Sequence, residues 1–466
     1  MAPAVASVIF AIGIAGLFFL DRGDKSRVSN ALWIPTVWLF FCTSRSLAQW
    51  LGMDATSDEA ANLASAYLEG NPVDRILLIV LEVIALIVVI NRGRRVGPIL
   101  RRNWVIGLFF FYAALSMAWS DYPFLTLKHW IKGIGDVLMV LIVLTEANVA
   151  GAVKNLVTRL GFVLLPLSLL LLYYYPSLGR THTMDWTPEP VGVATQKNGL
   201  GVLCDFIGLA FFWRFRSAYN DRKDPNRRRR LLALGAVLAT NLWLLRMCNS
   251  MTSICALSMA SGVMFLSTRP AFRRKPALVH LLIVAVLVFV TYALFFQSSG
   301  GLVQGLGRDP SLSGRSVGWS VFLSIPNNWL VGAGYESFWA GSRLLKIWDL
   351  SNGVKISEAH NGYIEMLLTL GWVGVVLLGV LIATGYRNVI GAYRSDPDIG
   401  SLRIAYFLAT IVTGFTEAAF RMMSPPWIVF LLATAVAPWI PQRKVSAVVT
   451  PTRDLLESGQ KPDAVR

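Results

Sequence analysis

The chain has 466 residues, of which 55% are hydrophobic and only 15% are charged, and its net charge is +16. Soluble domains usually contain about 25% charged residues, so this composition excludes an ordinary soluble enzyme and predicts a membrane protein. Apolar blocks follow one another along the chain, each close to the ~20 residues that a helix needs to cross a bilayer. We expect helices, because the bilayer core offers no water to backbone groups and the blocks do not alternate as barrel strands would.

Thirteen membrane-spanning helices are predicted, and twelve or fourteen would also fit the pattern. The first apolar run has no basic residue before it, which argues against a cleaved signal peptide. The turn at 248–251 and the block at 402–440 are the least distinct boundaries. The predicted spans are 3–20, 31–50, 75–91, 104–119, 129–147, 157–175, 197–215, 231–247, 252–268, 277–297, 361–386, 402–419 and 426–440. The expected fold class is all-α, a polytopic transmembrane helical bundle of about 12 or 13 spans.

Lysine and arginine gather in alternate loops, which indicates the orientation, because basic loops are retained in the cytoplasm. One set of alternate loops holds 30 of the 43 basic residues, and the opposite set holds 12. We therefore expect a transmembrane domain at 1–440, with the long loop 298–360 on the non-cytoplasmic face, and a short cytoplasmic tail at 441–466. The arginine run 227–230 suits a flank beside anionic headgroups better than a nucleic-acid patch, so no nucleic-acid partner is expected.

The loop at 298–360 is the segment in which we expect function, since loops of this length are usually functional or disordered. Its tryptophans and its nearly balanced charge are typical of a folded lid with helical pieces on the membrane surface. The aromatic side chains suit either the interface or sugar stacking, and we favour the interface and local packing. Gly332 and Gly334 lack the third glycine and the preceding strand of a dinucleotide site, so a tight turn between short helices is expected.

Two side chains of this loop suit glycan chemistry. Arg315 follows a flexible Ser-Gly turn, where its planar guanidinium could bind a phosphate through two hydrogen bonds. His360 lies beside a predicted helix N-terminus, whose dipole favours a neutral imidazole, and such a ring can take a proton from a sugar hydroxyl. Either residue alone is more often structural, and His129, His182 and His280 are rival histidines.

An ordered set of short motifs resembles the O-antigen ligase/polymerase superfamily, most of all its exopolysaccharide-polymerase branch. The motifs are Gln196–Gly201, Ser313–Arg315 with Trp319, Gly332–Tyr335 with Phe338–Trp339, Ala359–Tyr363 with Leu370–Gly371, and Thr416–Glu417. The likeness covers about 170–440, while the N-terminal third matches only as a hydropathy profile. Each motif is weak by itself, but their order around one long loop is specific.

This resemblance implies a glycosyltransferase of the bacterial inner membrane with a periplasmic active face. Such an enzyme moves a glycan from a polyprenyl diphosphate to an acceptor hydroxyl, with no metal and no other cofactor. His360 would activate the acceptor, and Arg315 would neutralise the leaving diphosphate, which needs preorganised positive charge. The residues expected to bind the diphosphate or the glycan are Arg308, Lys197, Asn198, Arg180, Asn361 and Glu417. Inversion at the sugar carbon is expected, because one direct displacement needs no enzyme nucleophile.

One position departs from the family pattern. Many members place an arginine or lysine in a Ser-rich turn before the ninth span, where this chain has Met251. Arg246, one turn earlier, is a candidate substitute.

The expected reaction is the joining of repeat units of an exopolysaccharide or O-antigen. A ligase that transfers finished glycan to lipid A-core or to protein is the nearest alternative. A transporter or flippase would place ionisable residues at mid-membrane depth in two matching halves; Glu82 and Asp205 lie in apolar stretches, but no internal repeat is visible. A non-catalytic scaffold is the remaining alternative. The expected partners are the lipid-linked glycan, membrane lipid, a flippase and a chain-length regulator.

Overall fold

The computed structural model describes residues 2–22, 28–53, 70–182, 186–295, 315–351 and 354–437. Arg308, the tail at 441–466 and the start of the long loop lie outside these residues. For residues 293–295 and 315–317 the structure describes the backbone only, so the side chain of Arg315 is also outside the description.

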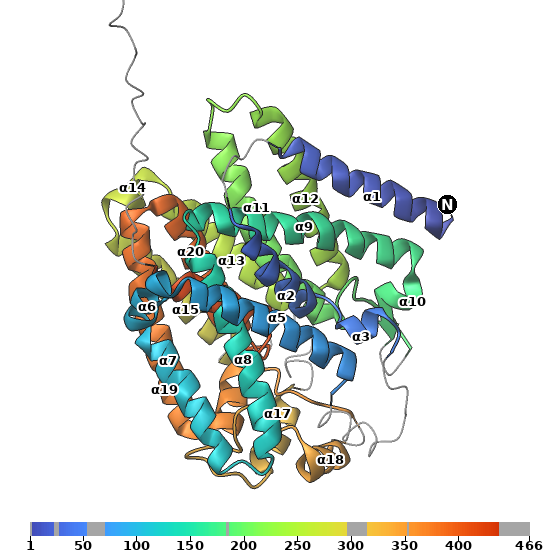
Figure 1. Cartoon of the computed structure of the whole chain (residues 1–466), viewed down its shortest axis with the longest axis vertical. Helices are drawn as coiled ribbons and strands as arrows, with labels where there is room; N and C mark the ends of the chain where they lie inside the picture. Colours follow the sequence, from blue (N-terminus) through green and yellow to red (C-terminus); the bar gives the residue numbers. More distant parts are fainter. Residues whose placement is uncertain are drawn as a thin grey trace, which may run out of the picture.

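Helices follow one another along the N-terminal half of the chain (Figure 1), with one small hairpin. The elements are α1 (Pro3–Leu20), the 3₁₀ turn η1 (Asn30–Leu32), α2 (Trp33–Thr43), α3 (Leu47–Trp50), α5 (Pro72–Asn91), α6 (Gly93–Arg102), α7 (Trp104–Leu115), η2 (Ser116–Ala118), α8 (Pro123–Leu144), α9 (Val149–Tyr174), α10 (Pro176–Gly179), β1 (Arg180–His182) and β2 (Pro188–Pro190). The two strands pair antiparallel, with Arg180 opposite Pro190.

The C-terminal half contains the longest helix and the described part of the long loop. Its elements are α11 (Lys197–Asn220), α12 (Arg227–Cys248), α13 (Met251–Ser267), α14 (Pro270–Arg274), α15 (Ala277–Phe295), α17 (Arg315–Ser324), α18 (Gly341–Leu350), α19 (Gly362–Ser395), α20 (Pro397–Thr413) and α21 (Pro425–Thr434). Each predicted span coincides with at least one of these helices or with part of one.

Among the described residues, five helices have both the length and the apolar character needed to cross a membrane: α1, α9, α11, α12 and α19. Several shorter apolar helices stand beside them, including α13 and α21. The predicted all-α polytopic class is confirmed, with the β1–β2 hairpin as a minor addition. The total of twelve or thirteen spans stays a prediction.

Three predicted spans end earlier than expected. The span at 402–419 ends at Thr413, and the other two end for visible physical reasons. The span at 31–50 is interrupted after Thr43, because Ser46 starts a new helix as one half of a capping box with Gln49. The span at 426–440 leaves helical geometry after Thr434. There the Arg403 guanidinium donates to the carbonyls of Ala433 and Ala435, which satisfies acceptors that the helix end leaves open.

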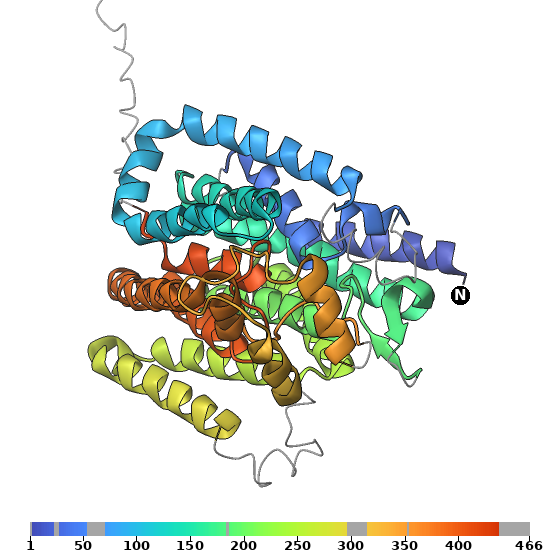
Figure 2. The same ribbon diagram turned by 90° about the horizontal axis from the view of Figure 1, so that it is seen from below.

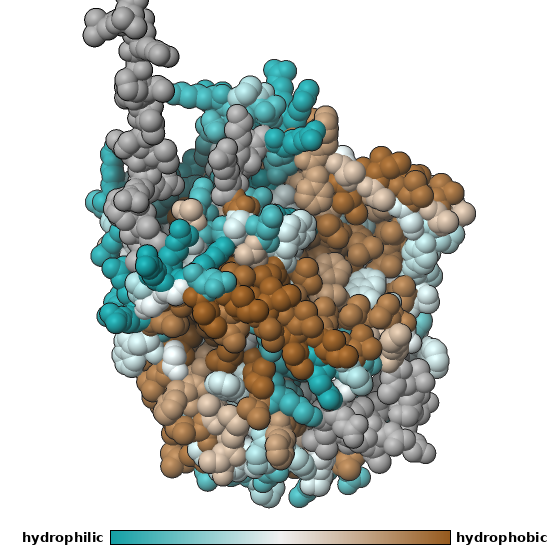
Figure 3. Space-filling model, viewed as in Figure 1, coloured by the Kyte–Doolittle hydropathy of each residue, from teal (hydrophilic) through white to brown (hydrophobic). Residues whose placement is uncertain are grey.

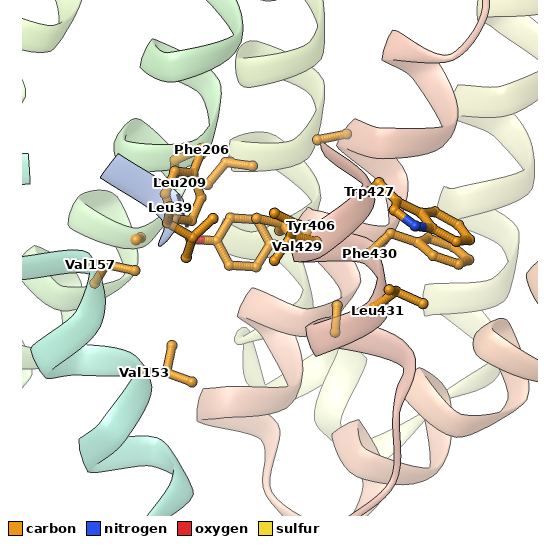
Figure 4. Packing of buried hydrophobic residues seen from close by; sticks show 14 of the residues in the cluster. Leu39, Val153, Val157, Phe206, Leu209, Tyr406, Trp427, Val429, Phe430 and Leu431 are labelled. Atoms are coloured by element: carbon orange, nitrogen blue, oxygen red, sulfur yellow. Dashed lines mark hydrogen bonds between the residues drawn. The ribbon is translucent and has the colours of Figure 1, made fainter. Parts of the chain in front are cut away.

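The centre of the molecule is formed by α11, α13, α20 and α21, with α20 packed against α13, α19 and α21. Aromatic rings fill this centre: Trp427 and Phe430 stack at 5.7 Å between ring centroids, and Tyr406 donates from its hydroxyl to the Phe206 carbonyl (Figure 4). In Figure 2, α5 and α15 lie on opposite flanks of this centre. The central helices therefore form a packed scaffold on which the long loop rests.

The long loop is fastened to α19 at a kink. Gly371 has a left-handed φ of 65°, and a Cβ at this position would lie 2.4 Å from the Leu330 carbonyl. Gly332, with φ of 74°, would meet the Thr369 carbonyl at the same distance. Backbone hydrogen bonds from Trp372 to the Trp329 carbonyl (2.8 Å) and from Gly334 to the Thr369 carbonyl (2.9 Å) join the two segments. Only glycine allows this approach without strain, so the predicted tight turn between short helices is confirmed.

Candidate active site

His360 lies at the junction between the long loop and α19. Its backbone has a left-handed φ of 47°, which turns the chain into the helix. The next residue, Asn361, caps α19: its Oδ1 accepts from the amides of Tyr363 and Ile364, both at 3.0 Å. The Asn361 Nδ2 donates to the Phe415 carbonyl at 3.0 Å, so this side chain fixes the start of α19 against the α20–α21 connection.

The His360 ring faces two carboxylates. Its Nδ1 lies 3.1 Å from Glu358 Oε1 and 3.4 Å from Glu417 Oε2, and the side chain is 31% exposed. A neutral ring that donates from Nδ1 to a carboxylate carries its basic lone pair on Nε2. The same three side chains are close enough together to hold a metal ion. The arrangement therefore suits either a proton acceptor oriented by carboxylates or a cation site.

A cavity of about 190 Å³ adjoins this histidine, and its lining includes both carboxylates. The remaining polar lining residues are Thr43, Ser44, Thr195, Gln196, Asn198 and Ser424. Ser44, the first residue after α2, lines the cavity together with Thr43 at the end of that helix. No lysine or arginine is among the described residues that line the cavity. Carboxylates, amides and hydroxyls bind sugar hydroxyls well, whereas this acidic wall repels a diphosphate.

Arg421 lies behind the histidine and connects three further carboxylates. Its Nε lies 2.9 Å from Glu336 Oε2 and 4.0 Å from Glu365 Oε1, and its Nη1 lies 3.3 Å from Glu358 Oε2. Burial alone lowers the pKa of this guanidinium, but the surrounding carboxylates outweigh burial and raise the pKa above its ordinary value. Glu358 therefore binds Arg421 through one oxygen and His360 through the other, which links the histidine to the buried charge network.

The two deepest carboxylates of this network have only 4% of their side-chain surface exposed. Glu365 accepts from the Trp339 indole at 2.5 Å and from the Ala359 amide, next to His360, at 2.9 Å. Glu336 reaches Arg421 from a left-handed backbone position with φ of 54°, and Met423, beyond Arg421, has the same φ. Positive φ at non-glycine residues is costly and tends to gather at functional sites.

Four of the six residues predicted to bind substrate fall into two groups; of the other two, Asn361 caps α19 and Arg308 lies outside the described residues. Asn198 and Glu417 line the cavity beside His360. Lys197 pairs instead with Glu189 of the hairpin, and Arg180 is exposed on β1. Neither of these two cations is among the described lining residues of the cavity.

Arg315 is the first residue of α17, four positions before Trp319, so the backbone places both on one face of that helix. The Trp319 indole donates to the Ala359 carbonyl at 2.8 Å. This hydrogen bond attaches α17 to the residue that precedes His360. The two motifs that sequence analysis singled out in the loop are thus neighbours in space.

The turn that contains Met251 lies beside the same site, because Thr416 donates to the Thr252 hydroxyl at 2.9 Å. Arg246, proposed as a substitute for the missing base, is exposed near the end of α12 and does not line the described cavity.

From the sequence we assigned no site role to Arg421, Glu336, Glu358 or Glu365. An acid inside a predicted span was an available signal for Glu365, since ionisable residues at that depth are usually functional. No sequence signal marks Glu336, because its partner Arg421 lies 85 positions away and the two meet only in the folded chain.

Two comparisons with known proteins concern this chain, and the first covers the part that contains His360. Residues 234–379 match a family model described as O-Antigen ligase, and this range contains Arg315, Glu358 and His360. The exopolysaccharide production protein ExoQ of Rhizobium meliloti (strain 1021) is 24% identical over 322 residues, which is 66% of this chain and 70% of that protein. Both matches confirm the resemblance predicted from the motifs, which is to the O-antigen ligase superfamily and its exopolysaccharide-production branch.

Proposed function

We propose that this protein polymerises polyprenyl-diphosphate-linked oligosaccharide repeat units at the periplasmic face of the bacterial inner membrane. The observation that carries the proposal is His360, which lies in the matched region and faces Glu358 and Glu417, two lining residues of a polar cavity. The exopolysaccharide relative and the apolar spanning helices support it. The domain at 1–440 would carry the reaction, and the tail at 441–466 would be cytoplasmic.

In the proposed mechanism the acceptor sugar occupies the acidic cavity. His360 Nε2 takes the proton from an acceptor hydroxyl while the hydroxyl oxygen forms a bond to the anomeric carbon of the donor. The bond from that carbon to the diphosphate oxygen breaks, and its electron pair leaves with the lipid diphosphate. Glu358 and Glu417 stabilise the imidazolium that forms. A positioned base of this kind contributes about 10²–10⁴-fold to rate.

The leaving diphosphate needs positive charge that the acidic cavity does not supply. We assign this role to Arg315, on the helix anchored beside His360, with Arg308 as the second cation of the same loop. Asn198 and Glu417 are assigned to the glycan. Lys197 and Arg180 would contribute less to substrate binding than the motifs suggest, because Glu189 already neutralises Lys197 and Arg180 lies outside the cavity lining.

The direct test is purified full-length protein incubated with a lipid-diphosphate repeat unit, with products sized by gel electrophoresis. We expect His360→Ala to abolish polymer formation and Glu417→Gln to slow it. The matched control is His182→Ala on β1, which is expected to keep wild-type product lengths. Polymer of normal length and rate from His360→Ala, or from the double variant His360→Ala/Arg315→Ala, would exclude the mechanism. A deletion strain that still makes full-length polymer would exclude the biological role.

Ligation is the second candidate, because the matched family model bears that description. A ligase would share the fold and the histidine chemistry but would transfer finished glycan to lipid A-core or to a protein. Mass analysis of the acceptor after reconstitution separates the two: a lipid-diphosphate product lengthened by one repeat unit supports polymerisation, and a modified lipid A-core or protein supports ligation. In either pathway a flippase and a chain-length regulator are the proposed protein partners.

A further inference from the structure

A second cavity, of about 440 Å³, lies where four helices come together. Its lining residues come from the C-terminal end of α1, the first residue of α2, the second and third turns of α9 and the last two turns of α11. None of them has a role in the proposed reaction. The charged lining residues are Asp21, Arg22, Lys154, Arg159 and Arg214, and Trp33 forms an aromatic wall.

The two cavities lie at opposite ends of α2 and α11. The acidic cavity is lined by Thr43 at the end of α2 and by Asn198 at the start of α11. The second cavity is lined by Trp33 at the start of α2 and by Arg214 near the end of α11. At about 1.5 Å per residue, α11 runs roughly 24 Å from Asn198 to Arg214, which is most of the ~30 Å hydrocarbon core of a bilayer. The second cavity therefore lies at the end that the basic loops predict to be cytoplasmic.

Positive charge dominates the lining of the second cavity. Four of the described lining residues are lysine or arginine, and one, Asp21, is an acid. Asp21 is already paired, because its Oδ2 lies 2.8 Å from Arg214 Nη2 and its Oδ1 lies 3.5 Å from Arg230 Nε. Segments 23–27 and 438–466, which lie outside the described residues on the predicted cytoplasmic side, both contain more bases than acids. Even if the one acid of 23–27 faced the cavity alone, four bases would stand against two acids.

Three of these cations have no carboxylate within 4.0 Å in the part of the chain that the structure describes: Arg22, Lys154 and Arg159. Two of them lie over indole rings instead, with Lys154 Nζ 5.5 Å from the centroid of Trp213 and Arg159 Cζ 4.0 Å from that of Trp33. The Arg159 Nη1 is buried and has no hydrogen-bond partner among the described residues. A buried N–H without an acceptor is unfavourable, so this atom favours a ligand with anionic oxygens.

The mouth of the cavity is apolar and continues onto the outer surface of α1. Trp33 is 53% exposed, and Phe19, under the Arg22 guanidinium, is 58% exposed. Figure 3 shows hydrophobic residues along α1 and hydrophilic residues beside the C-terminal end of that helix. Cations at the edge of such a surface are the arrangement that binds a lipid with an anionic headgroup. The exposed large apolar residues of α1 are Val5, Val8, Ile9, Ile12, Phe18 and Phe19.

We propose that this cavity binds the phosphate-bearing headgroup of an anionic lipid of the inner leaflet, whose hydrocarbon chains lie along the exposed face of α1. Arg22, Lys154 and Arg159 bind the phosphate, while Arg214 holds Asp21 away from it. A free phosphate ion would use the cations but would gain nothing from the apolar surface. A zwitterionic lipid would use that surface but would not match the excess of positive charge. The proposal does not depend on the reaction assigned to His360.

The experiment measures lipid retention by full-length protein in detergent, using native mass spectrometry after addition of phosphatidylglycerol or phosphatidylcholine. Each basic residue near an anionic headgroup contributes about fivefold in affinity, the equivalent of about 1 kcal/mol. Lys154→Gln/Arg159→Gln is therefore expected to bind phosphatidylglycerol about 25-fold more weakly than wild type. Lys154→Arg/Arg159→Lys, which keeps both charges, should retain binding.

The matched control is Arg101→Gln/Arg102→Gln at the end of α6. These two arginines are exposed, belong to another loop on the predicted cytoplasmic side and do not line the cavity. The control removes the same net charge as the Gln double variant, and we expect it to leave phosphatidylglycerol binding unchanged. An equal loss in the control would mean that net charge alone attracts the lipid, which would overturn the proposal.

Phosphatidylglycerol binding by the Lys154→Gln/Arg159→Gln variant at wild-type strength would also contradict the proposal, as would equal retention of phosphatidylcholine by wild type. Displacement of the lipid by millimolar inorganic phosphate would show a free-anion site instead and would equally exclude it. The melting temperature of each variant identifies a folding defect. If the Gln double variant does not fold, the lipid comparison and the phosphate competition on wild type still decide. Polymer formation is measured separately with His360→Ala, so failure of lipid binding and failure of the proposed reaction are distinguishable.

Discussion

Replacement of Arg421 by glutamine tests whether the charge network behind His360 organises the site. The substitution removes the cation that lies 2.9 Å from Glu336 and 4.0 Å from Glu365, and both carboxylates have only 4% of their side-chain surface exposed. Removing one partner of a buried ion pair typically costs about 3–5 kcal/mol, because the other charge stays buried without compensation. Arg421 itself is 25% exposed, so we expect the lower end, about 3 kcal/mol.

Thermal unfolding in detergent, followed by intrinsic tryptophan fluorescence, measures this effect. Glu336→Gln and the double variant Arg421→Gln/Glu336→Gln complete a double-mutant cycle. Since the double variant no longer buries an unpaired Glu336, we expect a coupling free energy of about 0.5–3 kcal/mol. The control is Asp121→Asn, which breaks the Arg343 pair in which the Asp121 side chain is 59% exposed, and it should cost no more than about 1 kcal/mol.

The reasoning would be refuted if Arg421→Gln changed the free energy of unfolding by no more than Asp121→Asn does. Additive behaviour of the two single variants would be equally damaging, since it would mean that Arg421 and Glu336 do not interact in solution. A loss of stability with full coupling would support the view that Arg421 holds Glu358, and through it the histidine, in place.

Three further predictions concern the loop, the hairpin and metal binding. Gly371→Ala should make the loop more sensitive to limited proteolysis and lower the polymer yield, because the φ of 65° and the close Leu330 carbonyl exclude a side chain at this position. The control is Gly379→Ala, which should change neither readout, because an added Cβ there would have no atom within 4 Å. Lys197→Gln should raise KM for the donor less than twofold, as expected for a cation already neutralised by Glu189, whereas a tenfold rise would show that Lys197 binds diphosphate. EDTA should leave turnover unchanged, and a loss restored by divalent metal would show that the His360 cluster holds a cation.

Much of the architecture follows from local patterns. Each apolar block predicted as a span contains a helix, because backbone groups without water must bond within their own segment. The interruption of the predicted span at 31–50 is also local in origin, because Ser46 and Gln49 form a capping box. An average of hydropathy along the chain does not detect such a box. The tight turn at Gly332 was predicted from the glycines of this segment alone. The structure gives the reason for the glycine, which is that its backbone lies close to the Thr369 carbonyl.

For the candidate site, too, local motifs identified some residues, while the fold decided the contacts that these residues make. His360, Asn198 and Glu417 were identified from their motifs; the structure places Asn198 and Glu417 in the lining of one cavity and His360 against Glu417. Asn361 was identified as well, but its side chain caps α19 and binds the Phe415 carbonyl. Lys197 belongs to the same short motif as Asn198, yet it turns to Glu189. Motif membership therefore indicates the neighbourhood of a residue and leaves its contacts open.

By itself the sequence determined that this chain crosses a membrane, which of its loops are basic, and which histidine stands before an apolar helix, because composition, charge distribution and periodicity are properties of the linear chain. Tertiary structure decided that Arg421 and Glu336, far apart in sequence, form one charge network with Glu358. It also decided that the cavity beside His360 is lined by the two carboxylates of Glu358 and Glu417. The physical reason is that electrostatic fields and packing depend on distances in space, which separation along the chain does not specify.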